Sequence, residues 1–409
     1  MNQHNLNNPL STEIQALIKL GKMVFSTESK ANFIDFSTKN TIDWDKLYDL
    51  ARFHQIRPLI LRGVSLLPEN NKPEALLIKL KHDCQHLAFH GLRQTAELIR
   101  LLNLYKQHNI LAIPYKGVWL ANTYYGDWSM REFSDIDIFV YEKDIVNIKK
   151  IMLLEGYTPQ LILTNAQEKM MMHILCEYNF DLFNKDNNRL FHIEPHYKSN
   201  GISDGVSHLT LYDFEQRLKE IPFTNTTIKC FSVEDNLLLM VIHHGMKEGW
   251  TLLKYLFDIY AVLKKEENVI DWAYISSKVE QLKIKKPLFI GLYLIHHLFD
   301  MRFPDYILVQ IQQPKIAILA HKRYQTLAKI KDKNKGFELF FFNLRCMETW
   351  GDRVKISVNR LFYPHAEDIH FLSLAPHLSF LYFFLRPIRG ILKFVLPQKT
   401  YAEWLRNSK

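Results

Sequence analysis

Residues 134–140 read Ser-Asp-Ile-Asp-Ile-Phe-Val. The β-branched and aromatic residues of this stretch predict a β-strand. Because side chains alternate between the faces of a strand, Asp135 and Asp137 should emerge on one face while the isoleucines enter a hydrophobic core. Two carboxylates in so apolar a strand need compensation by a cation, unless that face is simply solvated. Carboxylate oxygens at this spacing suit Mg²⁺, which keeps its other positions for water and substrate phosphates.

A strand-to-helix turn precedes this acidic strand. Residues 111–115 predict a short strand that ends at Lys116 and Gly117, and residues 118–125 predict a helix. Backbone amides and the positive end of the helix dipole at such a junction favour phosphate. We therefore expect Lys116 to bind phosphate; the alternative is an exposed loop lysine.

The loop that leads into the acidic strand carries one arginine, Arg131, four residues before Asp135. Its planar guanidinium could clamp a phosphate, or it could pair with Asp135 and hold the strand in place. The sequence leaves both roles open.

Together these residues resemble a largely uncharacterised family within the nucleotidyltransferase superfamily. The matching positions are Lys116, Gly117, Arg131, Ser134, Asp135 and Asp137. Members of the superfamily place a glycine-containing turn before two acids on one strand, and a third acid on a later strand. The likeness extends over most of the chain, because other segments follow in the order that the family shows: Asp43-Trp44, residues 51–59, Ile242-His243-His244, Asp258, Asp271-Trp272 and residues 382–389.

The best match to the third acid is Glu194, within a predicted strand over residues 189–196. The family shows a carboxylate followed two residues later by a histidine at this place, and here the histidine is His196. By strand alternation His192, Glu194 and His196 should share one face. Pro195 has no N–H to donate to a sheet, which predicts an edge strand or the end of a strand. The alternative for Glu194 is an exposed surface acid.

The resemblance implies a metal-dependent nucleotidyltransferase. Asp135, Asp137 and Glu194 would bind two divalent cations, Mg²⁺ or Mn²⁺. A nucleoside monophosphate would pass from a nucleoside triphosphate such as ATP to an acceptor hydroxyl or other nucleophile, and pyrophosphate would be released. Glu194 could also act as a general base. The residues expected to contact the nucleotide phosphates are Lys116, Gly117, Arg131 and Ser134. The acceptor, a small molecule, a peptide, a protein or an RNA end, is left open.

Three further residues are candidates for the substrate pocket: His196, His243 and Asp258. Asp258 follows an apolar helical run, so capping or internal pairing is the expected alternative to a substrate role. The chain has 18 histidines, which makes chance clusters common. We therefore expect histidines beside the acidic strands to be hydrogen-bond partners rather than metal ligands.

Composition agrees with a globular protein of two or three domains. The chain has 409 residues, a net charge of +9 and 47% hydrophobic residues. The positive charge favours encounter with polyanions, but it is spread along the chain and identifies no partner. Four widely spaced cysteines argue against a disulfide scaffold or a zinc motif, and residues 1–9 lack the order of a secretion signal. We expect a cytoplasmic protein.

The predicted fold is α+β, a small mixed β-sheet of the palm-like nucleotidyltransferase type flanked by helical regions. We expect an N-terminal helical region over residues 1–110, the nucleotidyltransferase core over residues 111–228 and a C-terminal helical region over residues 229–409. Within the core, residues 142–155 predict a helix that ends at Gly156, and residues 157–163, 177–183 and 189–196 predict strands.

Two other functions stay open. One is a catalytically silent protein that keeps the fold and binds a nucleotide or a partner. The other is weak contact with an anionic membrane through the aromatic and basic segment at residues 380–394, although burial of this segment in a helical domain is the expected alternative. The chain contains no Walker-type, Rossmann or His-Glu-x-x-His motif, which excludes several other phosphate and metal chemistries.

Overall fold

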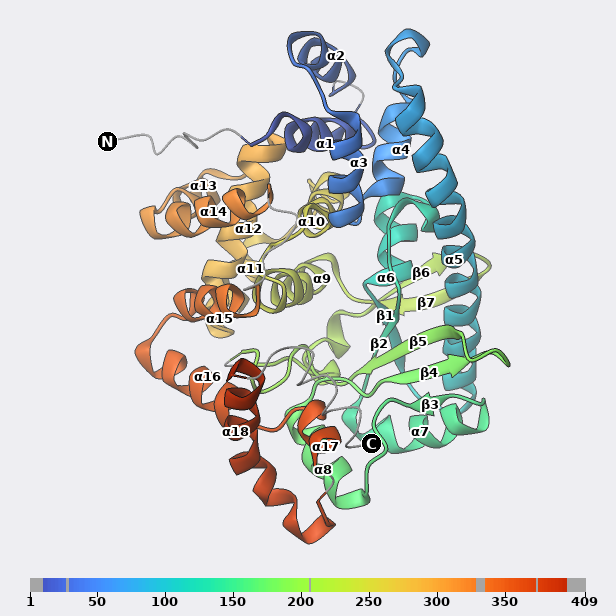
Figure 1. The fold of residues 1–409 in the computed structure, drawn as a ribbon, viewed down its shortest axis with the longest axis vertical. Coiled ribbons are helices and arrows are strands. Elements are labelled where there is room, and N and C mark those ends of the chain that lie inside the picture. The colour runs from blue at the N-terminus through green and yellow to red at the C-terminus, as the bar shows by residue number, and fades with distance from the viewer. Residues whose placement is uncertain (1–9, 27–28, 206, 329–334, 373, 396–409) are drawn as a thin grey trace. The chain divides into compact units, whose positions relative to one another are not determined.

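The computed structural model describes residues 10–26, 29–205, 207–328, 335–372 and 374–395. The chain forms two compact units, and each combines two separate segments (Figure 1). The first unit contains Met1–Asp137 and Arg217–Cys346, and the second contains Ile138–Gln216 and Met347–Lys409. The three regions expected from the sequence remain a prediction.

The described residues of the first unit begin with five α-helices. They are α1 (Thr12–Lys22), α2 (Ser29–Lys39), α3 (Trp44–Phe53), α4 (Arg57–Ser65) and α5 (Glu74–Gln107). The Ser11 side chain caps α1 by accepting a hydrogen bond from the backbone N–H of Ile14. Helices α1 and α4 pack so closely that a Cβ atom on Gly63 would lie 2.4 Å from the Leu20 carbonyl oxygen. Helix α5 is long, with 34 residues.

The second segment of the first unit starts with a hairpin of β6 (Lys219–Phe223) and β7 (Thr226–Cys230). Helices follow to the end of the segment: α9 (Val233–Met240) with a π-helical turn at Val241–Lys247, α10 (Leu253–Lys265), α11 (Trp272–Gln281), α12 (Lys285–Phe299), α13 (Asp305–Ile311), α14 (Pro314–Thr326) and α15 (Lys335–Cys346). The hairpin was not predicted, because Pro222 interrupts the pattern of its first strand.

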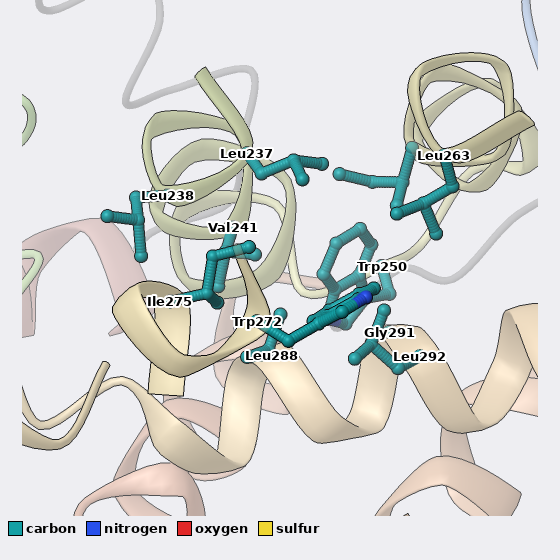
Figure 2. A pocket seen from close by; sticks show the side chains of 11 residues that line it. Leu237, Leu238, Val241, Trp250, Leu263, Trp272, Ile275, Leu288, Gly291 and Leu292 are labelled. Atoms are coloured by element: carbon teal, nitrogen blue, oxygen red, sulfur yellow. The ribbon is translucent and has the colours of Figure 1, made fainter. Parts of the chain in front are cut away.

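The helices α9 to α12 enclose a dense apolar core around Trp250 (Figure 2). The indole N–H of Trp250 donates to the Pro287 carbonyl oxygen at 3.0 Å. A Cβ atom on Gly291 would lie 2.5 Å from the Trp250 ring, so this position requires glycine. The remaining cavity encloses about 10 Å³ between apolar side chains. Small-molecule sites enclose roughly 300–1,000 Å³, so this cavity is a packing gap and not a substrate pocket.

One sheet contains β1 (Ala112–Tyr115), β2 (Ile136–Val140), β5 (Arg189–His196), β4 (Phe180–Phe183) and β3 (Thr158–Pro159), in that spatial order. Strand β2 starts in the first unit and continues in the second. The pairs β3–β4 and β4–β5 are antiparallel. Since β5 has neighbours on both sides, Pro195 lies near a strand end and not on an edge strand.

The second unit adds helices to the strands β3, β4 and β5. They are α7 (Ile145–Leu154), α8 (Asn165–Ile174), α16 (Trp350–Phe362), α17 (Ala366–Phe371) and α18 (Tyr382–Val395). Gly156 ends α7 with φ +82, as predicted. Two expectations were wrong in detail: the strand predicted over residues 157–163 is only two residues long, and α8 was missed. A small sheet with helical flanks confirms the predicted fold class.

None of the helices that the structure describes combines the length and the mean hydropathy needed to cross a lipid bilayer.

Candidate active site

The turn at Lys116 and Gly117 joins β1 to a short helix, α6 (Gly117–Leu120). Both residues have positive φ angles, 54° and 37°. A Cβ atom on Gly117 would lie 3.3 Å from the backbone oxygen of Asp135 and 3.9 Å from Oδ2 of Asp137. The absence of a side chain therefore lets this turn approach the acidic strand, and it leaves space beside the Asp137 carboxylate.

Gly117→Ala should destabilise the first unit by about 1–3 kcal/mol, because an L side chain is strained at this φ. Gly126→Ala is the matched control: its φ is +82, but its Cβ atom would meet nothing within 4 Å. The control isolates the backbone strain, so only Gly117→Ala should also weaken the binding of metal and nucleotide that we expect at this turn. Urea denaturation and calorimetry of both variants measure these effects. Equal ligand affinity in the two variants would contradict a close fit between the turn and the acidic strand.

Asp137 lies on β2 and forms a buried ion pair with Lys116. Lys116 Nζ is 2.9 Å from Asp137 Oδ1, and the two side chains are 7% and 2% exposed. The ammonium also lies 4.7 Å from the centroid of the Tyr115 ring. Asp135 is half-buried just before the strand, and Ser134 is exposed. A cation thus compensates the buried carboxylate, as the apolar strand requires.

Arg131 forms a two-point ion pair with Asp258 on α10. Its Nε and Nη2 atoms donate to Oδ1 and Oδ2 of Asp258, each at 2.8 Å. The Tyr125 hydroxyl donates to Oδ1 at 2.8 Å, and His244 Nε2 lies 3.3 Å from Oδ2. Burial alone would raise the pKa of Asp258, but Arg131 holds it well below its usual range. The sequence suggested that Arg131 binds phosphate or pairs with Asp135. Its partner in the structure is Asp258, which neither suggestion included.

Several charged groups surround this pair in the first unit. Arg57 donates from Nη2 to Glu132 and from Nη1 to Asp83, both at 2.6 Å, and so fixes the residue next to Arg131. Lys254 was missed by the sequence analysis, although it stands alone in an apolar helical run, four residues before Asp258. Its burial, together with nearby Arg131, lowers its pKa to about 8.

The two histidines that precede α10 have different environments. Burial lowers the pKa of His244 below its usual value, which favours a neutral ring. His243, a predicted pocket residue, is half-buried, and its Nδ1 atom is 2.9 Å from Nδ1 of His244. His243 therefore belongs to the hydrogen-bonded surroundings of Asp258.

In the second unit, Glu194 lies in a row of polar side chains on β5 and β4. His192 donates from Nε2 to Glu194 Oε1 at 2.9 Å and from Nδ1 to Asp181 Oδ1 at 2.7 Å. On the other side, His196 Nε2 is 3.5 Å from Glu194 Oε2. These contacts confirm that His192, Glu194 and His196 share one face of the strand.

His192 should be protonated at neutral pH. Burial lowers its pKa, but the bonds to Glu194 and Asp181 outweigh burial and raise the pKa to about 9. Because the folded pKa is raised, His192 stabilises the fold fully below the unfolded pKa of about 6.5 and loses this effect as the pH rises through 9.

NMR titration of histidine-labelled protein measures this pKa directly, with His192→Gln to assign the signal. Asp181→Asn should move the midpoint down, because it removes one of the two carboxylate partners. A wild-type midpoint at or below about 6.5 would contradict the charged state that the geometry favours.

The first unit thus brings together Lys116, Gly117 and Asp137, with Asp135 at the start of the strand, and it pairs Arg131 with Asp258. The second unit places Glu194 between two histidines. Their assembly into one metal centre stays a prediction.

The family profile described as uncharacterised nucleotidyltransferase matches residues 40–300. The chain belongs to this family. The match includes the Lys116 turn, Asp135, Asp137, Glu194 and Asp258, and it supports a general nucleotidyltransferase activity. No curated protein and no solved structure matches the chain.

Proposed function

We propose that this nucleotidyltransferase binds two divalent cations, Mg²⁺ or Mn²⁺, through Asp135, Asp137 and Glu194. It would transfer a nucleoside monophosphate from a nucleoside triphosphate to an acceptor hydroxyl or other nucleophile, with release of pyrophosphate. The observation that carries the proposal is the buried carboxylate of Asp137, which lies beside a turn where Gly117 has no side chain. Bound cations would polarise the phosphate oxygens and lower the pKa of an attacking group.

The donor set fits such cations. Both acids of the first unit offer carboxylate oxygens, the ligands that Mg²⁺ prefers. The Gly117 turn leaves space next to Asp137 Oδ2, where a Cβ atom would otherwise lie at 3.9 Å. The third acid, Glu194, lies on β5 in the second unit, and its place in one site with Asp135 and Asp137 is part of the proposal.

Lys116 and Arg131 have separate roles in this proposal. If Asp137 held a cation, the ammonium of Lys116 would be available to bind an oxygen of the triphosphate, next to the amides that begin α6. Arg131 holds the loop before β2 through its pair with Asp258 and acts as a positioning residue. Ser134 is exposed at the start of the strand and can donate a hydrogen bond to phosphate.

Glu194 is the proposed third acid. A protonated His192 would compensate part of the negative charge of Glu194, to which its Nε2 atom donates. Glu194 either completes the cation site or accepts the proton of the acceptor, and both roles need it ionised. The cytoplasmic location is part of the proposal; none of the four cysteines, all within the described ranges, forms a disulfide.

Label transfer tests the reaction. Purified enzyme, Mg²⁺ and a nucleoside triphosphate labelled at either the α- or the γ-phosphate are incubated with size-separated fractions of a cell extract. We expect the α-label to enter one acceptor fraction and the γ-label to leave as pyrophosphate. The Asp135→Asn/Asp137→Asn variant should transfer the α-label to no fraction. Transfer of the γ-label would overturn the proposal in favour of a kinase, and no transfer to any fraction would favour the silent fold.

A second proposal, weak contact with an anionic membrane, rests on α18. Phe384, Ile388 and Ile391 lie on one helical face and are 53–64% exposed. Arg389, however, pairs with Asp368 and Glu367 inside the second unit, so this cation is not presented to lipid. We expect full-length protein to co-sediment weakly with anionic vesicles and Ile388→Ser/Ile391→Ser to lose this binding. Equal sedimentation of the two proteins would contradict it.

A further inference from the structure

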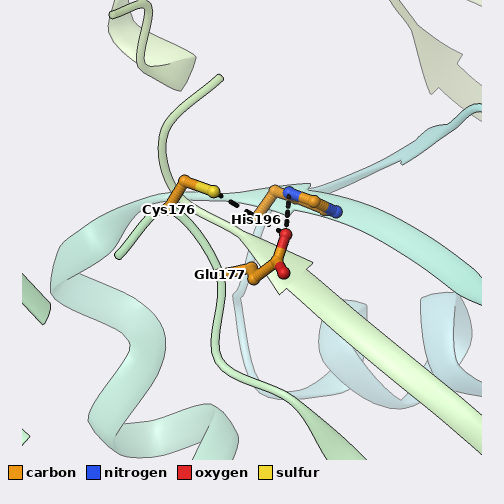
Figure 3. Close-up of side chains that lie close together, drawn as sticks. All are labelled: Cys176, Glu177 and His196. Carbon is orange, nitrogen blue, oxygen red and sulfur yellow. Dashed lines mark hydrogen bonds and ion pairs between the residues drawn. The ribbon is translucent and has the colours of Figure 1, made fainter. Parts of the chain in front are cut away.

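Three side chains of types that can bind a metal ion lie close together at the end of β5, in the second unit (Figure 3). Glu177 and His196 are partners in an antiparallel bridge. Backbone bonds fix this arrangement: Tyr197 N donates to the Cys176 oxygen at 2.9 Å, and Tyr178 N donates to the Pro195 oxygen at 3.0 Å. In Figure 3 the side chains of Cys176, Glu177 and His196 turn toward one another.

The distances between the donor atoms match a tetrahedral ion. Cys176 Sγ is 3.7 Å from Glu177 Oε2, and His196 Nδ1 is 3.3 Å from the same oxygen. All three donor atoms lie within 4.8 Å of one another. Bonds of about 2.3 Å to sulfur and about 2.0–2.2 Å to nitrogen and oxygen place tetrahedral ligands roughly 3.3–3.7 Å apart. Two of the three distances between donor atoms, Sγ to Oε2 and Nδ1 to Oε2, therefore need little adjustment for a tetrahedral ion.

His196 is oriented as metal-binding histidines are. Its Nδ1 atom faces Glu177, while its Nε2 atom lies 3.5 Å from Glu194 Oε2. Its ring stacks on Phe139 with an interplanar angle of 17°. A carboxylate on the second ring nitrogen fixes the tautomer and increases the basicity of the ligating nitrogen. Cys176 and His196 are also buried, which limits competition from water.

We propose that Cys176, Glu177 and Nδ1 of His196 bind a transition-metal ion of the Zn²⁺ class, with a fourth position for water. The thiolate and imidazole select such an ion over Mg²⁺, whose sites are built from oxygen. Binding removes the thiol proton to solvent as the metal–sulfur bond forms, so the affinity rises with pH. The ion would fix His196 and, through its Nε2 atom, the position of Glu194.

The spacing of the three residues does not match any metal-binding motif, so the sequence alone does not predict this site. The cysteine and glutamate are adjacent, but the histidine follows 19 residues after the glutamate and reaches it only through the bridge between 177 and 196. The expectation that histidines here are hydrogen-bond partners describes Nε2 of His196, and the proposal assigns a second role to Nδ1.

Cobalt titration of the full-length protein tests the site. The protein is first stripped with a chelator, and Co²⁺ is then added. We expect one equivalent to produce a thiolate-to-cobalt charge-transfer band and the strong visible bands of tetrahedral cobalt. Cys176→Ser should lose the charge-transfer band. Cys230→Ser should keep it, because Cys230 is also a buried thiol but lies on β7 in the other unit.

Two outcomes would overturn the site: a folded wild-type protein that gives no charge-transfer band, or a band that persists in Cys176→Ser. Glu194→Gln should keep the band and weaken Zn²⁺ binding about 10–100-fold, because Glu194 orients His196 and does not bind the ion. Asp135→Asn/Asp137→Asn should keep the band while losing nucleotidyl transfer. The cobalt band tests the Cys176 site and nucleotidyl transfer tests the proposed reaction, so either proposal can fail without the other.

Discussion

Asp137→Asn is expected to lower the rate of nucleotidyl transfer by at least about 10³-fold. Cations stabilise the charge that develops on the transferred phosphate by several kcal/mol, and each 1.36 kcal/mol corresponds to about tenfold in rate. An amide keeps the volume of the side chain but binds Mg²⁺ far more weakly than a carboxylate does. The rate of α-label transfer into the fraction that the wild type labels measures the effect.

The charge pair with Lys116 provides a control for folding. Asp137→Asn leaves the 7%-exposed ammonium of Lys116 beside a neutral group, which should also reduce stability. Lys116→Met/Asp137→Asn removes both charges and should recover stability without activity. Asp49→Asn, at an exposed position of α3, should change neither. Activity within about tenfold of the wild type in Asp137→Asn would contradict a metal role for this residue.

The second large effect is on stability. Asp258→Ala should destabilise the first unit by about 3–5 kcal/mol, because it leaves the guanidinium of Arg131 buried without its carboxylate partner. Arg131 is 5% exposed and Asp258 is fully buried, so solvent cannot replace the lost charge. Tyr125 loses its hydrogen-bond acceptor as well. Urea denaturation followed by tryptophan fluorescence reports on this unit, since Trp119 and Trp250 are buried in it.

The expected pH dependence has a definite sign. The folded pKa of Asp258 is depressed, so its contribution is present above the unfolded pKa of about 4 and is lost as the pH falls through the folded value. The difference in the free energy of unfolding between the wild type and Asp258→Ala should therefore become smaller only in strong acid.

Two controls separate the pair from general surface effects. Glu267→Ala, which removes an exposed acid just after α10, should change stability by less than about 0.5 kcal/mol. Arg131→Met/Asp258→Leu should recover much of the loss, because apolar residues can replace a buried ion pair. A loss below about 1 kcal/mol in Asp258→Ala would show that the pair contributes little.

Local patterns predicted the parts of the fold that depend on neighbouring residues. The apolar run around Asp137 forms β2, with Asp135 just before it. The Lys116 turn lies between β1 and α6, and the helix before Gly156 ends in the left-handed conformation. Helix α8 was missed although its signal was present: Thr164 and Gln167 form a capping box.

Distant contacts were beyond the reach of these patterns. Arg131 and Asp258 are 127 residues apart, and no local rule pairs them. The sequence supplied candidate roles for both residues, but only the packing of α10 against the loop before β2 decides the partner. A single antiparallel bridge likewise brings His196 close to Cys176 and Glu177. The spacing of these residues matches no known metal-ligand motif.

The most direct measurement for the central claim is calorimetric titration of the four common nucleoside triphosphates, with and without Mg²⁺, into the wild type and into Asp135→Ala/Asp137→Ala. We expect the wild type to bind at least one triphosphate only when Mg²⁺ is present, and the double variant to bind none. Binding that is independent of metal, or that survives the loss of both carboxylates, would contradict a metal centre on β2.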